Sequence, residues 1–222
     1  MKKATALIWV LLITVALHHT IFAGPGNKPF TGTITYDIRI EGNVPPEYRA
    51  MLPKTAVYQI SEQFVRVDMT PSMGGGAMIM DHKNQTMRAL IDYPGLKYQL
   101  VADEMLKEQA ARAKNINTTT ETKQIAGHLC KKAMVDAGGG NIAEVWYSEK
   151  IQVANLDKMW GNLKGFPLAF SNPLAGLPGV TMHFTATEVK SGKIDKKQFE
   201  ISSDYQTITQ EQLMQIMQGM GQ

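Results

Sequence analysis

The stretch FTGTITYDIRI, Phe30 to Ile40, alternates strictly between apolar and polar residues. Phe30, Ile34, Tyr36, Ile38 and Ile40 share one parity, and threonine, aspartate and arginine occupy the positions between them. Because successive side chains of a strand point to opposite faces, this period of two predicts a β-strand with one buried and one solvated face.

Weaker copies of this alternation follow along the chain. We expect strands at 55–61, 63–69, 77–81, 86–92, 96–102, 118–125, 128–136, 142–149, 180–189 and 194–201. Turn-rich stretches such as Asp92-Tyr-Pro-Gly95 separate them. Short strands with frequent turn signals indicate an antiparallel meander and a mainly β (α+β) chain.

Few segments have helical spacing. A helix is expected at 103–112 with Asp103 as its cap, and a second short one at 155–160. At the C-terminus, Thr209 and Gln212 have the spacing of a capping box that begins a last helix. Prolines at 167, 173 and 178 predict an irregular loop over 166–179.

The N-terminus has the features of a secretory signal peptide. Two lysines precede an apolar run from Ala4 to Leu17, which is too short to cross a bilayer as a helix, and a short polar break and Ile21-Phe-Ala23 follow. We predict cleavage after Ala23, so that 1–23 is the signal peptide and 24–222 is a single domain in the periplasm.

The charge of the mature chain argues against nucleic-acid binding. Without Lys2 and Lys3, 21 basic residues remain against 20 acidic ones. A nucleic-acid-binding protein needs a clustered basic surface. The single cysteine cannot form an internal disulfide, so the core must hold the fold unaided.

Several motifs together resemble a family of bacterial exported proteins, domain of unknown function 4412. They are Phe-x-Gly-Thr-Ile-Thr-Tyr at 30–36, Val-Arg-Val-Asp-Met at 65–69, Lys-Gln-Ile-Ala-Gly-His-Leu-Cys-Lys-Lys-Ala at 123–133, Trp-Tyr at 146–147, Lys-Gly-Phe-Pro-Leu at 164–168 and Phe-x-Ile-x-x-Asp-Tyr at 199–205. That family is distantly similar to the periplasmic lipoprotein carriers (LolA-like). The resemblance implies a single strongly curved antiparallel sheet or half-barrel of about ten strands, with two or three covering helices around an apolar cavity.

Cys130 is the first candidate for chemistry. On a strand it shares a face with His128, Lys132 and Met134, and Leu129 lies on the other face. A catalytic thiol needs an oriented base and an oxyanion site, and a metal centre needs three or four ligands; His128 and Cys130 supply two. We interpret Cys130 as a small buried apolar residue.

Methionines are the second candidate, with 14 in the chain. Met78, Met80 and His82 share a strand face, and thioethers are soft ligands suited to Cu(I). Methionine is also an adaptable residue for a core or an apolar cavity, which is the interpretation we favour.

His183 is expected to be solvated.

The leading hypothesis is a non-enzymatic periplasmic binding protein that holds a lipid, an acyl chain or a lipidated peptide, with no cofactor and no metal. Its expected cavity lining is Ile34, Tyr36, Ile38, Val65, Val67, Met78, Met80, Met182 and Phe184. The alternative is an envelope structural or sensing protein that binds another protein, for example at 118–123, which is polar on both faces as an exposed sheet edge would be. Copper handling is a third hypothesis.

Overall fold

The structure is a computed structural model that describes residues 28–71, 74–93, 95–104, 106–107, 116–136, 142–153, 160, 163–174 and 177–220. The predicted signal peptide and most of the helices expected at 103–112 and 155–160 lie outside these residues. None of the described helices is both long and apolar enough to span a membrane.

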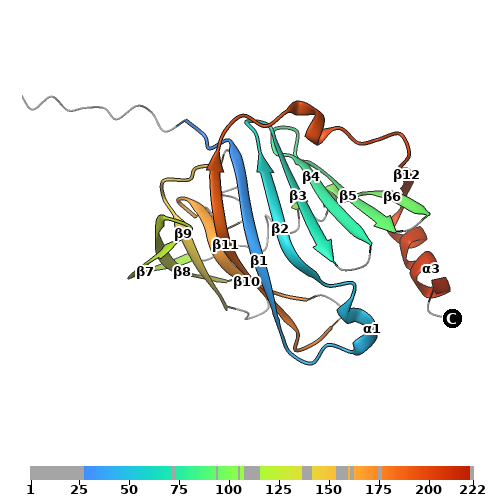
Figure 1. Cartoon of the computed structure of the whole chain (residues 1–222), viewed down its shortest axis with the longest axis horizontal. Helices are drawn as coiled ribbons and strands as arrows, with labels where there is room; N and C mark the ends of the chain where they lie inside the picture. Colours follow the sequence, from blue (N-terminus) through green and yellow to red (C-terminus); the bar gives the residue numbers. More distant parts are fainter. Residues whose placement is uncertain are drawn as a thin grey trace, which may run out of the picture.

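One curled sheet makes up most of the molecule (Figure 1). Its strands are β1 (Gly32–Glu41), β2 (Pro53–Ile60), β3 (Phe64–Pro71), β4 (Gly75–Asp81), β5 (Thr86–Tyr93), β6 (Leu96–Val101), β7 (Ile116–Ile125), β8 (His128–Asp136), β9 (Ile142–Ser148), β10 (Phe166–Pro173), β11 (Thr181–Ser191) and β12 (Gln206–Ile208). Their order across the sheet is β12-β6-β5-β4-β3-β2-β1-β11-β10-β9-β8-β7. The prediction of a single curved, mainly β sheet is confirmed, although the sheet has 12 strands rather than about ten.

The strand order divides the sheet into two meanders. β1 to β6 follow one another in the sheet as in the sequence, and so do β7 to β11. β1 joins the two groups by pairing antiparallel with β11 from Gly32 opposite Ser191 to Glu41 opposite Thr181. At Gly32, a Cβ would collide with the Lys190 backbone carbonyl, so this glycine permits the close pairing.

The alternation predicted for the opening stretch is confirmed in β1. Ile34 and Tyr36 are fully buried and Ile38 is nearly so, whereas Asp37 and Arg39 are exposed. We call the side of the sheet that carries Ile34, Tyr36 and Ile38 the core face, and the opposite side the outer face.

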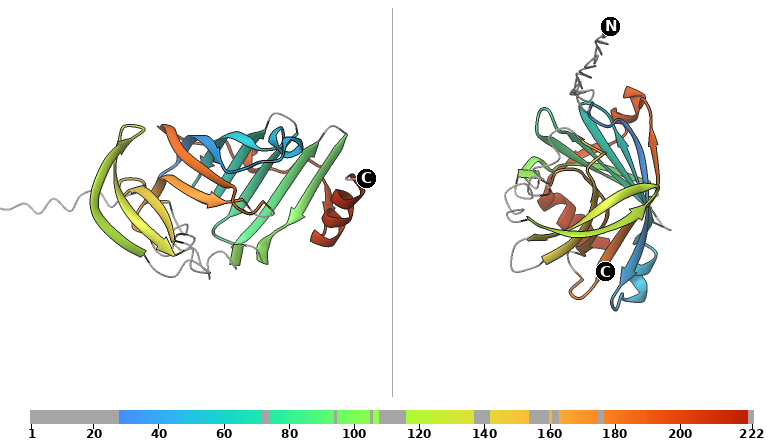
Figure 2. Two further views of the ribbon diagram at one scale, coloured as in Figure 1. Left: turned by 90° about the horizontal axis from the view of Figure 1, so that it is seen from below. Right: turned by 90° about the vertical axis from the view of Figure 1, so that its left-hand side faces the viewer.

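The core face is the concave one. Val67 on β3 and Ala133 on β8 belong to one hydrophobic cluster although their strands are not neighbours, so the curl of the sheet must bring them together. Figure 2 shows this curl, with β7, β8 and β9 bent round at one end. Much of the core is therefore sheet packed against itself.

Helices are few among the described residues, where 103–104 and 106–107 of the helix expected at 103–112 are helical. α1 (Pro46–Arg49) has four residues and connects β1 to β2, and α3 (Gln210–Met220) lies beyond β12 at the end of the sheet (Figure 1). The predicted capping box is present: the Thr209 N–H donates to Gln212 Oε1 (2.8 Å) and the Gln212 N–H to Thr209 Oγ1 (3.2 Å).

Asp103 has a different role from the cap that was predicted. Its Oδ1 accepts hydrogen bonds from the backbone N–H of Met87 and from the Arg88 guanidinium, both at 2.7 Å. The carboxylate thus ties the chain that follows β6 back to β5.

The loop predicted at 166–179 is wrong for its first half, which is the strand β10. Residues 166–170 are all buried, because β10 lies between β9 and β11. Pro167 is accommodated where the register with β9 shifts, between Pro167 and Ala169. Proline is tolerated in a sheet at such irregularities because a ladder hydrogen bond is already missing there. Pro178 does lie in a turn.

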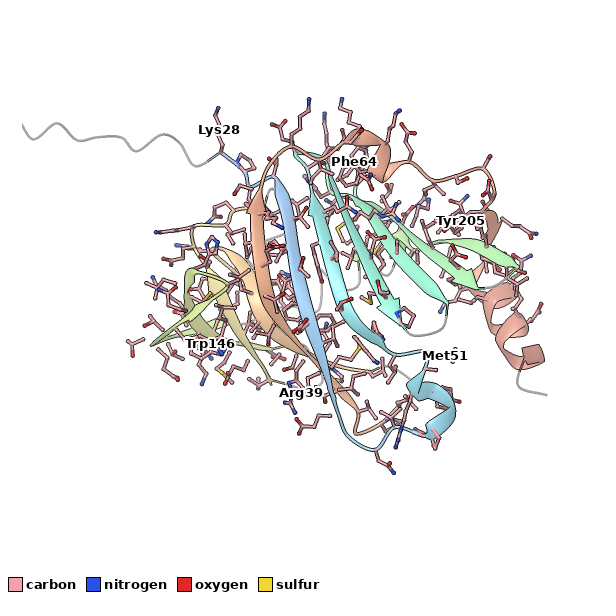
Figure 3. All side chains as sticks on the ribbon, in the orientation of Figure 1. Lys28, Arg39, Met51, Phe64, Trp146 and Tyr205 are labelled. Atoms are coloured by element: carbon pink, nitrogen blue, oxygen red, sulfur yellow. The ribbon has the colours of Figure 1, made fainter. Side chains whose placement is uncertain are left out.

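The strand predicted at 194–201 is also wrong. This segment contains the 3-10 helix η2 (Lys196–Phe199), and the Asp195 side chain caps it by accepting from the Lys197 N–H (3.0 Å). Phe199 stacks on Phe64 on the outer face, with ring centroids 5.4 Å apart. Figure 3 shows Phe64 beside this segment. Its apolar residues therefore cover a second cluster on the outer face instead of extending the sheet.

The Tyr36 hydroxyl connects the two meanders through the core by donating to the Pro167 carbonyl at 2.6 Å. Burial above all, with smaller contributions from Tyr58 and Cys130, raises the pKa of Tyr36, so the donor stays protonated. We expect Tyr36→Phe to lower the free energy of unfolding by about 1–3 kcal/mol, because a buried carbonyl loses its partner. Urea denaturation measures this. Tyr48→Phe, at an exposed ring, is the control and should change little; equal effects would contradict the role of the hydrogen bond.

Candidate binding surfaces

All nine residues expected to line a cavity lie on the core face in one hydrophobic cluster. Seven are at most 9 % exposed, and Met78 and Met182 pack against the cluster while partly buried. The structure therefore brings together residues from β1, β3, β4 and β11 that are far apart in the sequence. Their role as ligand contacts remains a prediction.

Aromatic rings fill the centre of this cluster. Tyr36 lies 5.0 Å from Tyr58 and 5.8 Å from Phe170 between ring centroids. Phe170 in turn stacks on Phe184 at 4.6 Å, nearly parallel. These separations are those of rings in direct contact. A ligand at this place would have to displace side chains that now contact one another.

Cys130 is fully buried in the same cluster. Its Sγ lies 3.5 Å from the His128 carbonyl oxygen. Desolvation raises the pKa of the thiol to about 11, and the positive charge of Lys123 offsets this shift only in part. The interpretation of Cys130 as a buried apolar residue is confirmed as to its position. A thiol with a raised pKa and no solvent contact is a poor nucleophile.

The prediction of which residues of β8 face inward is correct only in part. Cys130 and Ala133 are both buried, although residues three positions apart would lie on opposite faces of a regular strand, and Leu129 is 53 % exposed. The pairing of β7 with β8 shifts between Thr118 and Thr122. The additional residues of this irregularity belong to β7, and β8 changes its own alternation beside it, which strict alternation in the sequence cannot foresee.

β7 is the terminal strand of the sheet at the end opposite β12. It has ten residues, of which 117–118 and 120–124 are exposed. Its far side has no neighbouring strand among the described residues. The exposed edge expected at 118–123 is therefore present, and the sequence signal for it was the polarity of both faces.

A groove of about 690 Å³ lies beside this edge. It is lined by Ile116, Thr118, Thr119, Thr120, Thr122, Lys131, Tyr147, Glu149, Leu163 and Lys164. Tyr147 and Leu163 are each 2 % exposed and form an apolar floor. Lys131 Nζ lies 2.8 Å from Glu149 Oε2, while Lys164 is exposed and contributes a further positive charge. None of the nine predicted residues lines this groove.

The outer face behind the groove is held by a charged network around Trp146 (Figure 3). Lys132 Nζ lies 3.2 Å from Glu121 on β7 and 3.0 Å from Glu144 on β9. The Trp146 indole N–H donates to Glu144 Oε1 at 2.7 Å, and Lys123 Nζ lies 4.5 Å from the centroid of the indole ring. Hydrogen bonds from Lys132 and Trp146 lower the pKa of Glu144. These contacts connect the edge strand to the two strands behind it.

A second hollow, of about 480 Å³, lies where the β3–β4 connection meets the segment before β12. Its charged side chains are already paired. Arg66 lies 2.8 Å from Asp68, and the Tyr205 hydroxyl donates to Asp92 at 3.3 Å. Nothing in the sequence pointed to this place, because its residues come from four separate segments.

His183 is partly buried on the outer face rather than solvated as expected. Its Nδ1 lies 2.8 Å from Ser171 Oγ, and its Nε2 lies 3.1 Å from Glu41 Oε2. Although serine, histidine and glutamate are the residue types of some hydrolases, neither described hollow includes these three, and Glu41 is 62 % exposed. Catalysis by such a group would need a bound substrate and an oxyanion site.

Comparisons with known proteins identify a similar fold but no family. No family model matches the chain and no curated protein matches it, so the resemblance to domain of unknown function 4412 stays a prediction. The structure of PNGF-II overlaps with a TM-score of 0.52 at 16 % identity, covering 84 % of this chain and 32 % of that one. This chain thus spans about a third of the length of PNGF-II, and the similarity concerns the fold alone.

Two other solved structures overlap more weakly. MucB covers 81 % of this chain and 59 % of its own at 13 % identity, with a TM-score of 0.39. The complex of Pseudomonas aeruginosa MucA and MucB has a TM-score of 0.37 at 13 % identity, covering 81 % of this chain and 58 % of that one. At TM-scores this low the alignments support no argument about fold or function.

The environment of Cys130 predicts slow thiol chemistry. With a pKa of about 11, roughly one thiol in a thousand is ionised at pH 8, and burial blocks access as well. We expect a disulfide reagent to label the native protein at least tenfold more slowly than the urea-unfolded protein, as followed by absorbance. In a Cys130→Ala background, Leu129→Cys places a thiol at the exposed neighbouring position and should react fast. Rapid labelling of native Cys130 would contradict the buried assignment.

Proposed function

We propose that this protein is an exported binding protein of the bacterial envelope that holds an extended segment of a partner protein along the edge of β7. The observation that supports this proposal is the ten-residue terminal strand with an exposed edge. Backbone N–H and C=O groups along such an edge can pair with an added strand, which is a recurrent way of binding peptides.

The edge strand at the other end of the sheet, β12, is much shorter than β7. β12 has three residues and pairs parallel with β6. The capping box at Thr209 starts α3 immediately afterwards. A short strand that leads directly into a helix is a protected edge. Strand addition is therefore expected at β7.

The groove beside β7 would accommodate side chains of the added segment. Every second side chain of a strand points to the same face, so alternate residues of the partner would point to the side of the sheet on which the groove lies. Ligand pockets in proteins measure about 300–1,000 Å³, and the groove falls in this range. Lys164 and the Lys131–Glu149 pair provide polar contacts at its rim. We expect partner segments with apolar residues at alternate positions and a carboxylate near Lys164.

The network around Trp146 would prepare the edge for binding. Lys132 bridges Glu121 on β7 to Glu144 on β9, so the edge strand is connected to its neighbours before any partner arrives. A site that is already ordered loses less conformational entropy on binding. The network lies on the outer face and leaves the groove accessible.

Lipid binding on the core face is the second candidate. Its support is the continuous apolar cluster that contains all nine predicted residues, two of them only partly buried. Against it stands the direct contact of the rings around Tyr36, which a lipid would have to separate. Mass spectrometry of organic extracts of the protein, purified from a periplasm without detergent, tests this candidate. One lipid per protein would favour it; an empty protein that takes up no offered lipid would leave strand addition.

The strand-addition proposal predicts the effect of a proline in β7. Thr120 lies within the bulge and has no register partner in β8, so Thr120→Pro should leave the β7–β8 ladder intact while removing an edge donor. We expect peptides selected from a random library on the wild-type protein to bind at least tenfold more weakly to Thr120→Pro. Fluorescence anisotropy measures the affinity.

Thr120→Val is the matched control, because it keeps the N–H group and the β-branched shape; it should retain affinity within about twofold. Hydrogen exchange locates the bound peptide by new protection of amides in 116–125. Selected peptides that protect other amides, or that bind Thr120→Pro as tightly as the wild type, would rule the proposal out, provided that circular dichroism shows the variant to be folded.

A further inference from the structure

His82 is a buried histidine whose polar neighbours include the Ser61 backbone and the Asp81 carboxylate. Its side chain is 2 % exposed, and neither ring nitrogen has a hydrogen-bond partner of normal geometry among the described residues. Desolvation lowers the pKa of His82, and the nearby Ser61 backbone and Asp81 carboxylate offset only part of this effect. A neutral imidazole has one ring nitrogen with a free lone pair, which can bind a metal ion.

Two buried methionines lie near it in the sequence. Met80 on β4 lies directly opposite Met87 on β5, and the two are 8 % and 5 % exposed. The ladder of β4 with β3 continues past Asp81, because the His82 N–H donates to the Gln63 carbonyl at 3.1 Å. His82, the first residue of the turn after β4, thus follows Met80 by two residues, a separation of about 7 Å in an extended chain. Flexible thioether side chains can bridge such a separation.

We propose that His82, Met80 and Met87 form a binding site for a soft monovalent cation, Cu(I) or Ag(I). One imidazole nitrogen and two thioether sulfurs are ligands that such ions prefer over oxygen donors. The inference rests on residues at the β4–β5 turn and is independent of strand addition at β7.

The surroundings of the site suit a single positive charge. Asp81 is adjacent and largely buried, but its carboxylate accepts hydrogen bonds from the Gln63 and Asn84 side chains and from the Lys83 and Asn84 N–H groups. It would therefore compensate the charge of the ion without binding it. Residues 83–85 of the turn are exposed, which gives a short path from the surface to His82.

The structure changes the composition of the site that the sequence suggested. Met78 lies opposite Ala89, four residues from His82, whereas Met87 lies across from Met80 next to the histidine. No group of three or more histidine, cysteine, aspartate or glutamate residues in the described part of the chain is placed to hold a metal ion. A site among the described residues would thus have to use thioethers.

Metal titration of the mature protein tests the proposal. Because cysteine thiols in general are ligands for Cu(I) and Ag(I), every variant carries Cys130→Ala to exclude this contribution. Cu(I) is titrated without oxygen in competition with a chromophoric chelator, and Ag(I) serves as the redox-inert probe. We expect one equivalent of either ion to bind, and nitrogen NMR to show a shift of one His82 ring nitrogen on Ag(I) addition.

The variants separate the three ligands from other methionines. Met87→Leu and Met80→Leu, which conserve side-chain volume, should each weaken binding at least tenfold, and His82→Leu should abolish it. Met182→Leu, in the same hydrophobic cluster but outside the site, is the matched control and should bind like the parent. The absence of saturable binding, an unshifted His82 ring, or equal losses in Met87→Leu and Met182→Leu would each overturn the proposal; the NMR result does not depend on whether His82→Leu folds.

Discussion

The pairing of β1 with β11 is the contact on which the rest of the structure depends. It joins a meander of six strands to a meander of five, between residues 140 to 159 positions apart in the chain. Each meander is held together by connections between consecutive strands, but neither one can bury its apolar face alone. Because the Tyr36 hydroxyl also bonds to the Pro167 carbonyl, the two groups are joined on the core face as well as along the ladder. The cost of closing so long a loop must be met before this contact forms, so we regard it as the slow element of folding.

The same pairing decides which surfaces remain free. With β1 and β11 in the centre, β7 and β12 become the ends of the sheet. The segment after β11 crosses the outer face, where Phe199 stacks on Phe64, and reaches the far edge as β12. The C-terminal chain thus protects one edge and leaves β7 exposed. The groove lined by Tyr147 and Leu163 exists because the sheet curls most strongly beside that exposed edge (Figure 2).

Local patterns identified the residues of the core face correctly and failed where the backbone departs from regular pairing. The period of two in β1 depends only on backbone geometry, so it located Ile34 and Tyr36 inside without knowledge of any neighbour. β8 breaks that period next to its irregular pairing with β7, since Cys130 and Ala133 are both buried. Pro167 led to the wrong prediction of a loop where the structure has a strand, because proline indicates a loop unless a neighbouring strand accommodates it at an irregular position.

The sequence by itself determined that the chain is mainly β, which side chains face inward along most strands, where the last helix begins, and that Thr118 to Lys123 is polar on both faces. These properties follow from the alternation of side chains and from capping chemistry, both of which are local. Only the tertiary structure decided that β10 is a central strand, that 194–201 crosses the outer face, and that Met87 rather than Met78 stands across from Met80 beside His82. The choice of strand partners depends on which distant apolar face each strand can bury against, and no single segment contains that information.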